Sequence, residues 1–301
     1  MMRIGGHGLR LAAMWAALGL SQMIAGMLLW SAPEAGAEAV VEAGETLTSG
    51  QAFLIINTVY ALVVAWLAAR SRFSRLGRFV ALFLVVFGVR SVMGYSDLVF
   101  FGAEFDFDAL DLHRVVAMDA IVALAAAATA AAIYPVRSAR DAPAATAAPA
   151  GAAAWAWRLG AAVALYVAAY WIAGMFIAWS SPAVAEFYGG EAFLASVNVP
   201  ALFGFQVLRG LAWSGLVVLV LASHRGPLVE RALAAATAVA ALLAVMLVYP
   251  NDLMPEAVRY RHMIEIAVSN MAWGLAASVL LAPLAGHIIR RPRSGQVGVV
   301  T

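Results

Sequence analysis

The chain has 301 residues, of which 64% are hydrophobic and 12% are charged. Soluble domains carry roughly 25% charged residues, so this composition excludes an ordinary soluble protein and predicts an integral membrane protein. The formal net charge of +2 is too small and too scattered to indicate a nucleic-acid partner. The sequence contains no Cys, which excludes disulfides, iron–sulfur clusters, thiolate zinc sites and Cys nucleophiles.

Eight apolar stretches have the roughly 20 residues that a helix needs to cross a bilayer. The first follows Arg3 and Arg10. We expect it to be a retained span, with a cleaved signal peptide as the alternative. The predicted fold is all-α, a polytopic transmembrane helical bundle of about eight spans. These spans cover residues 9–30, 51–70, 79–100, 113–135, 159–180, 201–222, 229–249 and 262–284.

The segments between these spans alternate in charge. Acidic residues follow the first, third and fifth spans, whereas Arg residues follow the second, fourth, sixth and eighth. Fourteen of the 19 Arg residues therefore fall on one side, which the positive-inside rule makes cytoplasmic. We expect a multi-pass protein of the bacterial plasma (inner) membrane with both termini in the cytoplasm. Arg259 and Arg261, between the last two spans, are the exception.

The two halves of the chain resemble each other. The sequence Ile-Ala-Gly-Met occurs at residues 24–27 and again at 172–175, and His113 and His262 each open a span. Each half holds an even number of spans and so enters the membrane in the same direction, which predicts a parallel repeat. Chance similarity between Ala-rich helices is the alternative. The predicted units are a first four-span repeat (1–137), an Ala/Pro-rich cytoplasmic linker (138–154), a second four-span repeat (155–290) and a cytoplasmic tail (291–301).

The last span begins with charged residues. At 100° per residue, His262, Glu265, Ser269 and Trp273 fall on one stripe of that helix. An ionisable group inside an apolar helix is expensive, so it is a functional hypothesis by default.

The sixth span carries a second polar stripe, made of Gln206, Arg209 and Trp213. We expect Arg209 to pair with Glu265, because a buried charge without a partner is costly. The third and fourth spans offer Arg90 and Asp119 as a similar pair. Two interpretations stay open. The pairs either fix the packing of the helices or form a site for a ligand or an ion.

The residues expected to bind a ligand are all polar and lie within the predicted spans. They are Arg90, Asp119, Gln206, Arg209, His262, Glu265 and Asn270. No catalytic residue, cofactor or metal site is predicted, because His113 and His262 lie at span ends, where haem or zinc ligation is disfavoured. No Walker sequence, dinucleotide fingerprint or nucleophile elbow is present. The expected partners are the lipid bilayer and a small solute or ion, with no nucleic acid.

Three motifs carry a resemblance to a known group. These are the segments 176–190, 206–213 and 250–270. Together they resemble a group of bacterial polytopic integral membrane proteins with no established activity, mainly over residues 165–284. The resemblance implies a membrane location.

Two functions follow as hypotheses. The first is a carrier or binding protein for a small solute or ion, with a polar site in the outer half of the bundle. The second is a non-catalytic scaffold or accessory subunit whose intramembrane charges are structural. A membrane enzyme is disfavoured, because carboxylates are few.

Overall fold

The computed structural model describes residues 2–29, 45–100, 109–136, 151–189, 197–251 and 253–288. These ranges are helical and contain no β-strand, in agreement with the predicted all-α class. The helices in chain order are α1 (Met2–Leu29), α3 (Ser49–Ala69), α4 (Arg75–Phe87), the π-helix η1 (Gly88–Met93), α5 (Gly94–Phe100), α7 (Ala109–Ile133), α8 (Ala152–Ala173), the π-helix η3 (Gly174–Ala178), α9 (Pro182–Phe187), α11 (Val199–Ser223), α12 (Leu228–Ala244), the 3-10 helix η4 (Val245–Val248) and α13 (Glu256–Ile288).

Eight segments within the described ranges are long and apolar enough to cross a membrane, which confirms the predicted set. Several helices begin earlier than the hydropathy pattern indicated. The largest differences are at α1, which begins at Met2, at α8, which begins at Ala152, and at α13, which begins at Glu256, directly after Pro255. Glu256 and Arg259, in the charged first turns of α13, have partners elsewhere in the bundle and therefore fit into a helix. A hydropathy pattern does not take such partners into account. Most of the predicted linker lies outside the described residues.

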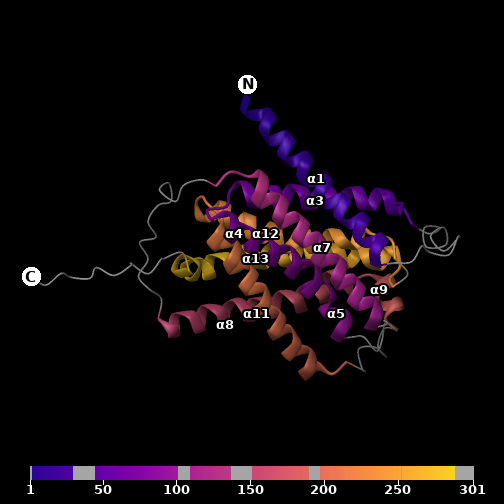
Figure 1. The fold of residues 1–301 in the computed structure, drawn as a ribbon. Coiled ribbons are helices and arrows are strands. Elements are labelled where there is room, and N and C mark those ends of the chain that lie inside the picture. The colour runs from indigo at the N-terminus through magenta and orange to yellow at the C-terminus, as the bar shows by residue number, and fades with distance from the viewer. Residues whose placement is uncertain are drawn as a thin grey trace, which may run out of the picture.

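The helices form one bundle (Figure 1). α1 lies on one side of it, against α3 and α7, and α8 lies on the opposite side, against α11 and α13. α12 is the most deeply buried span. The Tyr60 hydroxyl of α3 donates a hydrogen bond to the Leu242 carbonyl of α12, at 2.6 Å between the two oxygens.

Contacts between the helices follow the same order in both halves. α1 packs on α3 and α7, as α8 packs on α11 and α13. Across the halves, α3 contacts α12 and α11 contacts α4. These are the contacts that two parallel four-span units would make about an axis along the bundle. The repeat itself stays a prediction.

The connections between α3 and α4 and between α11 and α12 pair with each other. Ser71 and His224 form an isolated antiparallel bridge. The Arg72 amide donates to the Ser223 carbonyl and the Arg225 amide to the Arg70 carbonyl, both at 2.8 Å. Arg70 also forms an ion pair with Glu230. Burial lowers the pKa of His224 to about 4, so the ring is neutral at pH 7. We call this end of the bundle the bridge end.

The opposite end carries α9 and is called here the α9 end. There the Arg259 guanidinium is completely buried and forms an ion pair with Glu45, with 2.9 Å between Nη1 and Oε1. Arg259 also donates to the carbonyls of Met254 and Leu247. This pairing accounts for one of the two Arg residues that break the predicted charge pattern.

α12 and α13 approach closely at a small-residue contact. A Cβ added at Gly274 would lie 2.8 Å from the Ala236 Cα, so only glycine fits without movement. Small residues permit such contact between membrane helices.

We predict that Gly274→Ala lowers stability by about 1–3 kcal/mol, because the added methyl overpacks this contact. The measurement is the midpoint of thermal unfolding in detergent. Gly215→Ala is the matched control. Nothing lies within 4 Å of a Cβ at Gly215, so this change should be neutral, or stabilising by up to about 1 kcal/mol through helix propensity. Equal midpoints for the two variants would contradict the close contact.

Candidate functional site

The polar stripe of α11 faces the inside of the bundle, as the sequence predicted. Gln206 and Trp213 have no exposed surface, and Arg209 is 7% exposed. Arg209 is ten residues into α11, which places it about 15 Å along the helix. A guanidinium at this depth requires a partner.

That partner is Asp97, at the far end of the third span. Arg209 Nη1 lies 2.6 Å from Asp97 Oδ1. The predicted pairing of Arg209 with Glu265 is therefore wrong. Glu265 instead forms its ion pair with His262, one turn earlier on the same helix, with 2.8 Å between Oε2 and Nδ1. His262 is three residues before Glu265 on the same helix, so the two side chains meet without reaching across the bundle. For this reason Glu265 pairs with His262 and not with Arg209.

The Glu265–His262 pair continues toward the surface. His262 Nε2 lies 3.2 Å from the hydroxyl oxygen of Tyr188, just after α9. Glu265 is 8% exposed, and His262 and Tyr188 are half-buried. Tyr188, His262 and Glu265 thus form a chain of titratable groups from the α9 end into the bundle.

Both Arg209 and Glu265 adjoin a π-helical turn. In η1, the Met93 carbonyl oxygen lies 3.4 Å from Arg209 Nη2. In η3, a Cβ added at Gly174 would lie 3.6 Å from Glu265 Oε1. π-turns are rare and occur frequently at functional sites. We call Asp97, Gln206, Arg209, His262 and Glu265 the polar cluster.

Arg90 and Asp119 meet as the sequence predicted. Arg90 Nε lies 2.6 Å from Asp119 Oδ1, and their side chains are 5% and 0% exposed. The guanidinium carbon of Arg90 is 5.1 Å from the centre of the Tyr60 ring. Tyr95 also interacts with Asp119. Enclosed on these sides, the pair joins η1 to α7.

Gln206 lacks hydrogen-bond partners. Neither its amide nitrogen nor its amide oxygen has one among the described residues, and the same holds for Arg209 Nε. Asn270 differs, since its Nδ2 donates to the Val239 carbonyl oxygen at 3.2 Å. Asn270 therefore joins α13 to α12, whereas Gln206 has unused donors and acceptors one turn from Arg209. Almost all buried polar groups in proteins are hydrogen-bonded.

Sequence reasoning missed Asp97 and the tyrosines around the polar cluster. Tyr166 and Tyr170 of α8 interact electrostatically with Asp97, Arg209 and Glu265. The signal for Asp97 was available, because it is an ionisable residue inside the expected third span. For the tyrosines no signal was available, because Tyr166 and Tyr170 lie inside the expected fifth span, where a Tyr ring also fits ordinary helix packing.

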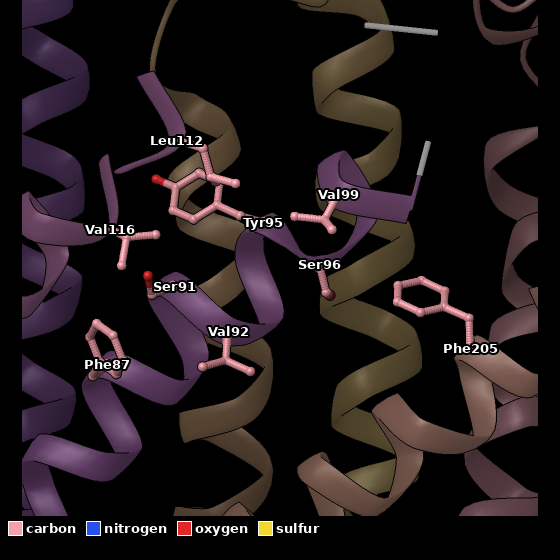
Figure 2. A pocket seen from close by; sticks show the side chains of 9 residues that line it. All are labelled: Phe87, Ser91, Val92, Tyr95, Ser96, Val99, Leu112, Val116 and Phe205. Atoms are coloured by element: carbon pink, nitrogen blue, oxygen red, sulfur yellow. The ribbon is translucent and has the colours of Figure 1, made fainter. Parts of the chain in front are cut away.

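A separate groove of about 290 Å³ lies between α4, η1, α5, α7 and α11 (Figure 2). Its lining is mainly apolar, and Figure 2 shows the Tyr95 hydroxyl directed toward α7 and away from Phe205. The lining residues are Phe87, Ser91, Val92, Tyr95, Ser96, Val99, Leu112, Val116 and Phe205. Phe205 separates the groove from the polar cluster, because the Arg209 guanidinium carbon lies 5.5 Å from the centre of its ring.

The eight spans and the charges buried among them define a multi-pass integral membrane protein. Comparison with protein families, with curated proteins and with solved structures gives no match. The resemblance to a group of bacterial membrane proteins therefore stays a prediction. Among the described residues, no three His, Asp or Glu side chains are placed to hold a metal ion.

We predict that Arg209 and Asp97 are energetically coupled. Asp97→Leu should cost about 3 kcal/mol or more, because it leaves a buried guanidinium without its carboxylate. Arg209→Met should cost less, because the Asp97 side chain is 40% exposed and water can solvate it. The double variant should recover part of the loss, measured as unfolding midpoints in detergent.

The matched control combines Arg209→Met with Glu265→Gln. These residues have separate ion-pair partners, so their coupling should be smaller than that between Arg209 and Asp97. Additivity of the Arg209 and Asp97 substitutions, together with coupling in the control, would restore the original pairing and contradict the geometry described above.

Proposed function

We propose that the chain binds a small solute or ion at the polar cluster, as a carrier or binding protein. The observation that carries the proposal is Gln206, which is fully buried and has no hydrogen-bond partner among the described residues for either amide atom. An amide in that state costs about 1–3 kcal/mol. A polar occupant beside Gln206 and Arg209 removes that cost.

The exposure of the charges supports this location. The Asp97 side chain is 40% exposed while its partner Arg209 is 8% exposed, so the pair extends from a solvated rim into the bundle. His262 and Tyr188 extend from the same end to Glu265. A solute from the α9 end would reach Arg209 past these groups.

The alternative is a scaffold or accessory subunit whose buried charges are structural. Arg90 and Asp119 favour it, because both side chains are almost completely buried and adjoin other protein groups. If the protein is a scaffold, the buried Gln206 amide has no hydrogen-bond partner and lowers the stability of the bundle.

The proposal includes a location and an internal symmetry. We propose that the bridge end faces the cytoplasm of a bacterial cell and that the polar cluster opens to the outside. The distribution of Arg residues in the sequence supports this orientation. The matching helix contacts of the two halves support a parallel four-span repeat.

The orientation predicts which side chains a membrane-impermeant thiol reagent reaches. The chain has no Cys, so single Cys residues report without background. In intact cells Glu186→Cys, exposed at the α9 end, should be labelled, and Arg75→Cys, exposed at the bridge end, should be labelled only after lysis. The reverse pattern would overturn the orientation.

The binding function is tested by Gln206→Leu, with Asn270→Leu as the matched control. Both substitutions remove a buried amide, but only Asn270 has a partner. Thermal unfolding in detergent is followed with choline chloride, which carries a hydroxyl group as well as an ammonium group, and with sodium acetate, glycine and glucose, at equal ionic strength. At least one probe should raise the midpoint of wild type and of Asn270→Leu, but not of Gln206→Leu.

The scaffold alternative gives a different result. None of the probes would shift the wild-type midpoint, and Gln206→Leu would be more stable than wild type by about 1–3 kcal/mol, because an unsatisfied amide is replaced by an apolar group. That outcome would overturn the binding function.

A further inference from the structure

The charges of the polar cluster do not cancel. Arg209 is matched by Asp97. Glu265 has only His262 as its ion-pair partner among the described residues, and that ring is charged only when protonated. With His262 neutral, two carboxylates stand against one guanidinium, and Asp97 and Glu265 interact electrostatically. The cluster then carries an excess negative charge inside the bundle, where uncompensated charge is costly.

Aromatic rings gather where this excess charge meets the surface. The rings of Trp179 and Tyr188 are 5.8 Å apart, and those of Tyr188 and His262 are 5.9 Å apart. An aromatic ring attracts a cation through its negatively charged face, and rings beside carboxylates are the arrangement that recognises ammonium groups.

The sequence has most of its acidic residues on the same side. All but two of the 17 acidic residues fall in the first, third, fifth and seventh connections of the sequence or in the spans near them, the exceptions being Asp141 and Glu230. Only five of the 19 Arg residues fall there. An excess of one sign of charge raises the local concentration of small ions of the opposite charge.

We infer that the solute taken by the polar cluster is a small organic cation with a primary or quaternary ammonium group, held at Glu265 beside the rings of Trp179 and Tyr188. This inference rests on the proposed binding function. An ammonium group supplies the charge that Glu265 lacks. A divalent metal ion fits less well, because the described residues offer no group of three His, Asp or Glu ligands. The unpartnered Gln206 amide supplies hydrogen bonds to polar atoms elsewhere on the solute.

The test measures saturable stabilisation by tetramethylammonium chloride in detergent at constant ionic strength. The wild-type unfolding midpoint should rise with concentration and level off as the site fills. Glu265→Gln should abolish the rise. Glu256→Gln is the matched control. Glu256 is at the same end, but its carboxylate accepts hydrogen bonds from Thr46, so this substitution should leave the rise in the midpoint unchanged.

A second pair of variants keeps the test decisive if Glu265→Gln does not fold. Tyr188→Phe retains the ring and should keep the tetramethylammonium effect, whereas Tyr188→Leu should lose it. Equal effects in these two variants would contradict the inferred ring contact.

The remaining outcomes separate this inference from the proposed function. If acetate or glucose stabilises the wild type and tetramethylammonium does not, the solute is not a cation, while the binding function stands. If no probe stabilises the wild type, both fail. An effect that never saturates, or that Glu265→Gln shares, is a general salt effect and overturns the inference.

Discussion

The cost of a charge in a hydrocarbon environment governs the half of this bundle nearest the α9 end. A charged side chain between apolar helices persists only where a partner neutralises it. Three guanidiniums obey this constraint, and each joins distant parts of the chain. Arg90 joins η1 to α7, Arg209 joins α11 to the third span, and Arg259 joins α13 to the segment before α3.

These pairs differ in the exposure of their carboxylates. Asp119 is completely buried and Glu45 is 8% exposed, so the Arg90 and Arg259 pairs connect segments inside the bundle. Asp97 is 40% exposed. A carboxylate in contact with water can exchange its partner for a solute at little cost, whereas an enclosed one cannot. The binding function that we propose is therefore located at Arg209, whose partner is exposed and which lies beside the unsatisfied Gln206 amide.

The sequence was sufficient for the class and the span count, since hydrophobic runs determine which segments cross a bilayer. It also predicted that the Gln206 and Arg209 face is buried and that Arg90 meets Asp119. It failed on the partner of Arg209. The assignment of residues to one face of a helix assumes 100° per residue. The π-turn of η1 changes this angle just before Asp97. Sequence periodicity does not reveal such a turn, and the partner of a charge depends on the relative rotation of two helices.

The central claim is that water and small cations reach the inside of the bundle beside Glu265. The most direct measurement uses Gly174→Cys in this Cys-free chain, because a Cβ at that position would lie 3.6 Å from Glu265 Oε1. Its labelling rate is compared for a cationic and an anionic methanethiosulfonate reagent, each normalised to the exposed Glu186→Cys. The account predicts that Gly174→Cys reacts and that the cationic reagent is favoured there more than at residue 186. No reaction at Gly174→Cys with either reagent, while Glu186→Cys reacts with both, would contradict it.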